Sequence, residues 1–337
     1  MSAGRRAGLI DVHTHVTPMH ISASSAPGLA WPCMVCNGPK DATLMVGDKP
    51  FRRLDDRSWD MGRRCEDMDR DGVAMQVLSP MPELLSYWFP ESDAERLCDE
   101  MNGAIAEMVA RDPMRFRGLG MAPLQNPDRA ARYLERLRER FGLSGIEIGS
   151  NINGILPGDA RFASVMEAAA AQELAIFVHA LHPLSTKGID GGAMLGPIVG
   201  FPMDVALAAS SLILGGTLDR LPSLRIGFSH GGGALGALLG RLDQGWTNLP
   251  ELRETLAHRP SDYARRFFFD SNVYDPSLLR YLARDAFAGR IFVGTDYPYV
   301  IMQTDPAGFL AAAGLDETEL AGVARGAALL FLNEADR

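Results

Sequence analysis

The sequence has little that would suit it to an oxidising compartment, a membrane or a nucleic acid. Its 337 residues include only four cysteines, too few for a disulfide framework. Basic residues are the minority, 33 Lys and Arg against 42 Asp and Glu, and the net charge of -9 gives no general attraction to nucleic acids or anionic membranes. No apolar run is long enough to span a bilayer, and the apolar stretch after the basic N-terminus is too short for a signal peptide. We therefore expect a cytoplasmic protein without nucleic-acid or membrane partners.

The composition is that of a folded enzyme. Hydrophobic residues make up 47% of the chain and charged residues 22%, which is ordinary for a globular protein and argues against disorder. The length suits a single large domain, because an α/β barrel with insertions reaches this size as one unit. With no internal repeat in view, we expect one domain over residues 1–337.

Short β-like runs alternate with longer helical patterns along most of the chain. The clearest helical patterns cover residues 92–111 and 127–140, where apolar residues recur every three or four positions. Pro127 after Asn126 is typical of a helix start. Eight strands separated by helices predict an α/β protein with a (β/α)8 TIM barrel, and a doubly wound sheet is the alternative. The expected strands are Gly8–His15, Ala74–Leu78, Arg117–Met121, Gly145–Ile148, Ala175–His179, Arg225–His230, Phe267–Ser271 and Ile291–Asp296.

One region breaks the alternation. Residues 18–60 are rich in proline, glycine and small side chains, and the region is too long for a plain strand-to-helix loop. We interpret it as an insertion with short strands that caps the active site. A second glycine-rich loop, residues 184–204, follows a later strand.

Ionisable side chains stand at the ends of several expected strands. His13 and His15 close the first, and because strand side chains alternate faces, both imidazoles can point into one pocket. His179, His230 and Asp296 end three later strands. In a barrel the carboxyl ends of the strands form one rim, where active sites lie. Imidazoles and a carboxylate on that rim suit a catalytic divalent metal such as zinc, whereas unrelated buried polar residues would each need a separate explanation.

These residues are part of a longer pattern that resembles the amidohydrolase superfamily. More narrowly, the sequence resembles the metal-dependent decarboxylases related to aminocarboxymuconate semialdehyde decarboxylase, of the amidohydrolase-2 type. Besides the histidines and Asp296, the resemblance is carried by Phe51-Arg52, Glu66-x-Met68-Asp69-x-x-Gly72-Val73, Pro123-Leu124-Gln125, Ser211-Leu212-Ile213-Leu214-x-Gly216, His230-Gly231-Gly232-Gly233, Leu239-Gly240-Arg241-x-Asp243 and Gly294-Thr295-Asp296-Tyr297-Pro298.

The resemblance implies a metal site and the residues that serve it. By it, His13, His15, His179 and Asp296 bind one zinc ion per chain, or another divalent metal. His230 stands beside the metal-bound water as acid and base, and Asp296 shares the catalytic role. Zinc lowers the pKa of its water towards roughly 7, so hydroxide is available at neutral pH.

The resemblance also implies a reaction and a partner. Arg52 would hold a substrate carboxylate and Arg241 would do so from a neighbouring subunit, so we expect a homodimer. The reaction would be non-oxidative decarboxylation of a small unsaturated or aromatic carboxylate, in which hydroxide adds and CO2 leaves. The alternative is a hydrolase of an ester, lactone or amide on the same site.

The chain departs from the pattern after the third histidine ligand. His179 is followed by Ala180-Leu181-His182-Pro183-Leu184, where relatives acting on the muconate semialdehyde have a turn similar to His-Pro-Trp. The metal chemistry therefore carries over better than the substrate. His182 is either a substrate contact or a surface loop residue.

Two further features have open interpretations. Glu147 lies on the fourth expected strand and is either a bridge to a second metal or a buried hydrogen-bonded group. Cys33 and Cys36 form a single CxxC pair, and neither Cys65 nor Cys98 completes a zinc ribbon with it, so we expect ordinary thiols.

Overall fold

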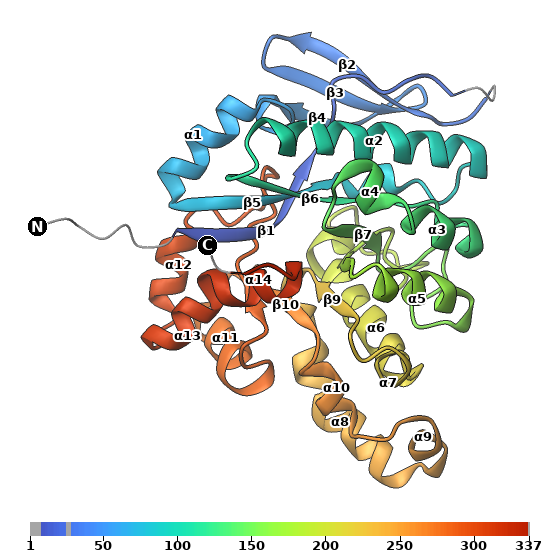
Figure 1. Ribbon diagram of the computed structural model, residues 1–337, viewed down its shortest axis with the longest axis vertical. Coiled ribbons are helices and arrows are strands. Elements are labelled where there is room, and N and C mark those ends of the chain that lie inside the picture. The colour runs from blue at the N-terminus through green and yellow to red at the C-terminus, as the bar shows by residue number, and fades with distance from the viewer. Residues whose placement is uncertain (1–7, 25–27, 336–337) are drawn as a thin grey trace, which may run out of the picture.

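The computed structural model describes residues 8–24 and 28–335, and it contains the predicted barrel (Figure 1). The basic residues 1–7, on which part of the signal-peptide argument depends, lie outside the described residues. Parallel strands form an eight-stranded sheet in the order β1-β5-β6-β7-β8-β9-β10-β11. Their bounds are β1 Leu9–Val16, β5 Val73–Pro80, β6 Phe116–Gly120, β7 Gly145–Gly149, β8 Ala175–His179, β9 Arg225–Phe228, β10 Phe268–Asp270 and β11 Ile291–Phe292.

The sheet closes on itself between its first and last strands. The Val12 amide donates to the Val293 carbonyl at 2.8 Å, and the His15 amide donates to the Tyr297 carbonyl at 2.7 Å. Parallel bridges at Asp11–Val293 and Thr14–Tyr297 continue this pairing beyond the two residues of β11. The strand order follows the chain order, so the doubly wound alternative is wrong.

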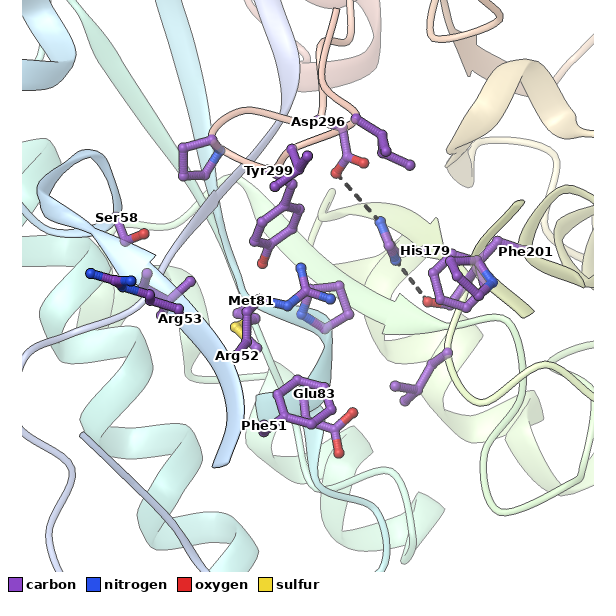
Figure 2. Close-up of a pocket in the computed structure, with 18 of the residues that line it drawn as sticks. Phe51, Arg52, Arg53, Ser58, Met81, Glu83, His179, Phe201, Asp296 and Tyr299 are labelled. Carbon is purple, nitrogen blue, oxygen red and sulfur yellow. Dashed lines mark hydrogen bonds and ion pairs between the residues drawn. The ribbon is translucent and has the colours of Figure 1, made fainter. Parts of the chain in front are cut away.

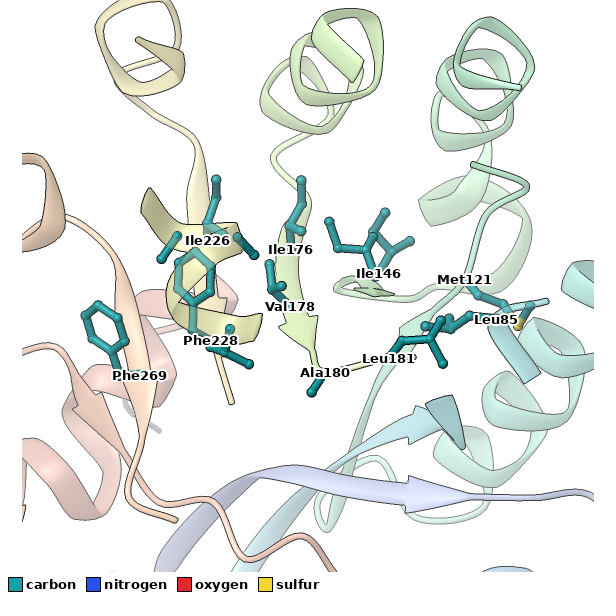
Figure 3. Close-up of a cluster of buried hydrophobic side chains, with 14 of the residues drawn as sticks. Leu85, Met121, Ile146, Ile176, Val178, Ala180, Leu181, Ile226, Phe228 and Phe269 are labelled. Atoms are coloured by element: carbon teal, nitrogen blue, oxygen red, sulfur yellow. The ribbon is translucent and has the colours of Figure 1, made fainter. Parts of the chain in front are cut away.

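Side chains alternate between the barrel interior and the helical layer. On β8, Ala175 and Phe177 belong to the interior cluster, which Phe331 of the last helix closes from one end. Ile176 and Val178 face the other way, into the larger cluster between strands and helices (Figure 3). The alternation leaves His179 on the interior side at the carboxyl end of the strand.

Helices surround the sheet, and the helix Glu91–Arg111 confirms the helical pattern expected over residues 92–111. The expected helix at 127–140 is wrong in one respect: it is broken between Leu134 and Leu137, and the break lets both leucines be fully buried. Asn126 caps the first piece, its side chain accepting from the Arg129 amide. The α-helices are α1 Met61–Asp71, α2 Glu91–Arg111, α3 Pro127–Leu134, α4 Leu137–Phe141, α5 Ala163–Ala171, α6 Phe201–Leu214, α7 Thr217–Arg220, α8 Leu235–Asn248, α9 Pro250–Thr255, α10 Pro260–Ala264, α11 Pro276–Tyr281, α12 Pro306–Ala312, α13 Glu317–Ala321 and α14 Ala327–Leu332. Shorter turns of helix are η1 Asp56–Ser58, η2 Pro82–Leu85, η3 Ala160–Phe162, η4 Gly196–Gly200, η5 His230–Gly232, η6 Leu282–Ala286 and η7 Gly322–Gly326.

Residues 18–60 contain a separate three-stranded antiparallel sheet, as expected of the insertion. Its strands are β2 Pro32–Gly38, β3 Asp41–Val46 and β4 Lys49–Asp55, and they lie beside α1 and α2 at the top of Figure 1. At the opposite end of the view, α8, α9 and α10 form an arm that extends away from the barrel.

One helical stretch corrects the expectation that no apolar run could span a bilayer. Gly196–Leu214, which joins η4 to α6, has the length and a mean hydropathy of 1.7 that a membrane span requires. Val205, Ala208 and Leu212 are nevertheless fully buried in the core between strands and helices. Packing on the barrel therefore accounts for only part of its apolar character, since Ile198, Val199, Met203 and Leu207 are exposed.

Candidate metal centre and active-site cavity

A register shift in β1 places both of its histidines inside the barrel. Ile10 and Val12 belong to the interior cluster, yet His13 also faces inward, with its ring 5.2 Å from that of Phe177. The pairing with β5 shifts between Asp11 and Thr14, which moves the side-chain alternation by one residue. His13 and His15 then point the same way, and the Thr14 hydroxyl donates outward to the Val77 carbonyl at 2.8 Å.

Four buried donor atoms converge at the carboxyl end of the barrel. They belong to His13, His15, His179 and Asp296 and lie within 4.8 Å of one another. Asp296 Oδ1 is 3.2 Å from Nε2 of His13, 3.2 Å from Nε2 of His15 and 4.0 Å from Nε2 of His179. The two Nε2 atoms of the β1 histidines are 3.1 Å apart. Ligands of one tetrahedral zinc ion, each about 2.1 Å from it, would be about 3.4 Å apart.

The hydrogen bonds on the far side of each ring decide which nitrogen is free. Nδ1 of His13 faces Asp270 Oδ2 at 2.6 Å, Nδ1 of His15 faces the Pro80 carbonyl at 3.0 Å, and Nδ1 of His179 faces the Ala180 carbonyl at 2.8 Å. Each Nδ1 therefore donates, and in a neutral ring the Nε2 lone pair is left pointing at the other three atoms.

The four converging atoms are therefore all hydrogen-bond acceptors, and no hydrogen-bond donor in the described part of the chain faces them. Within the described residues, His179 Nε2 and Asp296 Oδ1 are buried without a hydrogen-bond partner. Buried acceptors that face one another repel unless a cation or proton lies between them. A divalent metal ion fits this donor set, and neutral imidazole and carboxylate are its usual ligands.

The pKa values follow the same geometry. Burial lowers the pKa of His15 to about 4 and that of His179 well below its usual value. Burial opposes ionisation of Asp296, but the neighbouring His13 holds the pKa of Asp296 well below its usual value. Burial likewise opposes a charge on His13, yet Asp296 and Asp270 raise its pKa to about 10. Without a metal, the cluster would thus keep one proton on His13, in the place that a cation would take.

His230 lies beside this cluster without belonging to it. Its ring centroid is 5.4 Å from that of His179 and 5.6 Å from that of His13, and burial lowers its pKa. The sequence placed His230 and Asp296 on strands, but both follow the strand ends, with φ values of 55° and 66°. Such left-handed backbone in residues other than glycine concentrates at functional sites.

Glycines permit these turns. At Gly233 (φ 58°) an added Cβ would lie 1.7 Å from the Pro202 carbonyl oxygen. At Gly294 a Cβ would lie 2.5 Å from Cβ of Asp270 and 2.8 Å from Cβ of His13. Only glycine at 294 therefore lets the chain before Asp296 approach the histidine it accompanies.

Asp270 is a site residue that the sequence reading missed. Besides facing His13 Nδ1, it accepts from the backbone amides of His230 at 2.9 Å and Gly231 at 2.7 Å. One buried carboxylate thus orients a candidate ligand and the turn that carries His230. Its signal was available, because it is an acidic residue at the end of an expected strand, as Asp296 is.

A cavity of about 490 Å³ opens above the cluster. His179 and Asp296 form its floor, and β4 of the insertion contributes Phe51 and Arg52 to its wall (Figure 2). The predicted carboxylate-binding residue Arg52 is therefore in the cavity, and no ion pair involving it occurs within the described part of the chain.

Tyr299 lies between Arg52 and the cluster of candidate metal ligands, and the sequence did not predict it as a site residue. Its ring stacks on His15, with centroids 5.0 Å apart, and the Arg52 guanidinium lies 4.4 Å from the centre of the Tyr299 ring. The Tyr299 hydroxyl is buried and has no partner among the described residues, and burial raises its pKa well above the usual value. Nothing in the sequence singled it out among the tyrosines.

The remaining candidates lie elsewhere. Glu147 Oε2 is 3.7 Å from His15 Nδ1, on the side of the ring away from the cluster, and burial raises the pKa of Glu147 well above the usual value. Both of its carboxylate oxygens are buried without a hydrogen-bond partner among the described residues, so the expectation of a hydrogen-bonded group is wrong. Arg241 is exposed on α8. Cys33 and Cys36 are exposed free thiols on β2.

Comparison with known proteins agrees with this site. The amidohydrolase family model matches residues 10–333. The chain belongs to that superfamily.

Within the superfamily, relatives of the chain include proteins named as decarboxylases. It is 33% identical over 330 residues to 2-amino-3-carboxymuconate-6-semialdehyde decarboxylase of Dictyostelium discoideum, covering 96% of this chain and 91% of the relative. It is 28% identical to gamma-resorcylate decarboxylase of a Polaromonas species, over 77% of this chain and 83% of the relative. The crystal structure of 5-carboxyvanillate decarboxylase of Sphingomonas paucimobilis superposes with a TM-score of 0.82 at 28% identity, covering 98% of this chain and 100% of that one. The chain is thus a carboxy-lyase of the amidohydrolase superfamily.

Proposed function

We propose that this protein is a zinc-dependent, non-oxidative decarboxylase of a small unsaturated or aromatic carboxylate. The observation that carries the proposal is the set of four converging acceptors, two of which form the floor of a cavity that also contains Arg52, an arginine with no ion pair among the described residues. His13, His15, His179 and Asp296 would hold one metal ion. Three imidazoles favour zinc over manganese, which prefers sites richer in oxygen. When bound, the metal would supply a Lewis acid that activates water and polarises substrate oxygens.

The protein's own groups would bind the substrate and move the proton. Decarboxylation breaks the bond between carbon and carboxylate, releases CO2 and returns one proton to the carbon. His230 is positioned to take a proton from a water molecule and return it to that carbon, because its ring borders the cluster and burial lowers its pKa, which favours the neutral form that accepts the proton. Asp296 would take part as the anionic member of the cluster.

Arg52 would orient the carboxylate at the cavity wall. Its guanidinium lies over the Tyr299 ring, 4.4 Å from the ring centre, and its N–H groups would form a fork towards a carboxylate. The unpartnered Tyr299 hydroxyl would donate to the same substrate. The β4 segment that carries Arg52 belongs to the insertion, which in this proposal caps the active site in a soluble, cytoplasmic enzyme.

Assays of the two possible products separate decarboxylation from hydrolysis. Zinc-loaded protein is incubated with hydroxybenzoates, dicarboxylated phenols and muconate semialdehydes, and separately with aryl esters and lactones. We expect CO2 release in step with loss of substrate and no acid release from the esters. Acid release without CO2 would instead support the hydrolase.

The homodimer is tested by mixing two inactive variants. Arg241 lies on the arm that extends from the barrel, so its role at a carboxylate would be in a partner's cavity. Arg241→Ala and His230→Ala chains should regain activity when mixed, because one of the two cavities then has both residues. No recovery after confirmed exchange of chains, or an active monomer, would contradict the shared site.

A further inference from the structure

A carboxylate and an imidazole form a fixed pair in the wall of the cavity. Glu83 Oε2 lies 3.1 Å from His182 Nε2, and both residues line the cavity that ends at His179 and Asp296. The Glu83 side chain is 13% exposed and that of His182 is 55% exposed. Figure 2 shows Glu83 on the side of the cavity away from Asp296.

The pair is held from both sides. The His182 ring stacks on Trp88 with centroids 4.8 Å apart, and the Asn151 side chain donates to the His182 carbonyl at 3.3 Å. His182 comes three residues after His179, and its φ of 43° is left-handed. Glu83 follows β5 on η2. Two loops that begin at the barrel rim therefore fix the pair relative to the metal cluster.

The other acidic and basic groups of the cavity wall are already neutralised. Arg57 pairs with Asp55 at 2.7 Å, and Arg53 pairs with Asp41 at 2.6 Å. What remains is one cation without an ion pair, Arg52, and one carboxylate, Glu83, whose ion pair in the described structure is with His182 alone. The cavity thus offers a site for a carboxylate and, elsewhere in its wall, a hydrogen-bond acceptor.

We propose that Glu83, positioned by His182, selects substrates that carry a hydroxyl or amino group on the part of the molecule away from the carboxylate that is lost. This inference rests on the proposed function and deepens it. Glu83 would accept a charge-assisted hydrogen bond from the donor group and repel a second carboxylate or leave a methoxy oxygen facing an anion. A hydrogen bond to a charged group can discriminate by about 10- to 100-fold, because an acceptor that loses its partner stays desolvated.

Binding of analogues that cannot react tests the inference without relying on turnover. In 2-nitrophenols the nitro group takes the place of the leaving carboxylate. A series with a hydroxyl, methoxy or carboxylate substituent at each other ring position is titrated into zinc-loaded protein by calorimetry. At one ring position the hydroxyl compound should bind about 10- to 100-fold more tightly than the methoxy and carboxylate compounds.

Isosteric replacement should abolish or invert this preference. In Glu83→Gln the hydroxyl compound should lose about tenfold in affinity and the carboxylate compound should gain about as much. In His182→Phe, which keeps a ring for Trp88 but lacks Nε2, the hydroxyl preference should fall part of the way. Glu107→Gln, at an exposed position on α2, is the matched control and should change neither affinity.

The possible outcomes distinguish a failure of the role proposed for Glu83 from a failure of the proposed decarboxylase function. Equal or absent changes for the two compounds in Glu83→Gln, with unchanged zinc content, would overturn the role of Glu83. A hydroxyl preference that is lost or inverted in Glu83→Gln, together with no CO2 release from any carboxylate, would support the recognition site and contradict decarboxylation.

Discussion

The two ends of the cavity are built from different parts of the chain. At the floor, His13, His15 and His179 lie on barrel strands, and Asp296 is tied back to β1 by its amide, which donates to the His13 carbonyl at 2.9 Å. The opposite wall comes from the insertion and from loops, which supply Arg52, Glu83 and His182. Strand ends of a closed sheet hold side chains in one geometry, whereas loops tolerate substitution and insertion. In our proposal the floor therefore sets the reaction and the wall sets the substrate.

The largest effect should come from the floor. His179→Ala removes one ligand and leaves the other acceptors without a complete site. We expect metal content well below one equivalent and a loss of activity of about 10⁴-fold, since several kcal/mol of transition-state stabilisation depend on the metal. Metal analysis by mass spectrometry and CO2 release measure both. Full metal content in this variant would show that His179 is not a ligand.

The variant His230→Ala should separate metal binding from proton transfer. The ring lies outside the cluster, so we expect the metal to stay bound and activity to fall by about 10²- to 10⁴-fold, the usual worth of a general acid–base group. The same two measurements apply. Loss of the metal along with activity would instead move His230 into the ligand set.

A smaller effect is expected from Asp270, which contacts a candidate metal ligand and is not one itself. Asp270→Asn keeps the shape of the side chain but weakens its hold on His13 Nδ1, 2.6 Å away. Residues that orient a metal ligand are typically worth 10- to 100-fold in metal affinity or activity. Competition with a chelator measures the zinc affinity, and Asp275→Asn, a helix cap on the surface, serves as a control. An unchanged affinity would mean that His13 needs no orienting partner.

The smallest effect should come from the outer face of the insertion. Cys33 and Cys36 are exposed on β2 and do not line the cavity. The double variant Cys33→Ser/Cys36→Ser should keep its zinc content and stay within about twofold of the original activity, because surface substitutions away from a site seldom matter. A loss of one equivalent of zinc would reveal a second metal site in the insertion.

The same contrast explains what the sequence could and could not predict. The eight strands and the paired histidines of β1 could be predicted from the sequence, because apolar runs and an HxH spacing are local patterns. The register shift after Asp11 could not be predicted, since it depends on the pairing of β1 with β5. Asp270 stands at the end of an expected strand, but its hydrogen bond to His13, 257 positions away, appears only in the fold. Tyr299 and Glu83 were not predicted for a related reason: each reaches the cavity only because the loop that carries it folds back over the rim.

The metal stoichiometry of activity tests the central claim most directly. Protein stripped of metal is titrated with zinc while CO2 release is followed. The account predicts that activity rises linearly and saturates at one equivalent per chain, and that Asp296→Asn shows no such rise. Saturation at two equivalents would contradict it and would make Glu147 a bridge between two metals. Full activity in protein proven free of metal would contradict it outright.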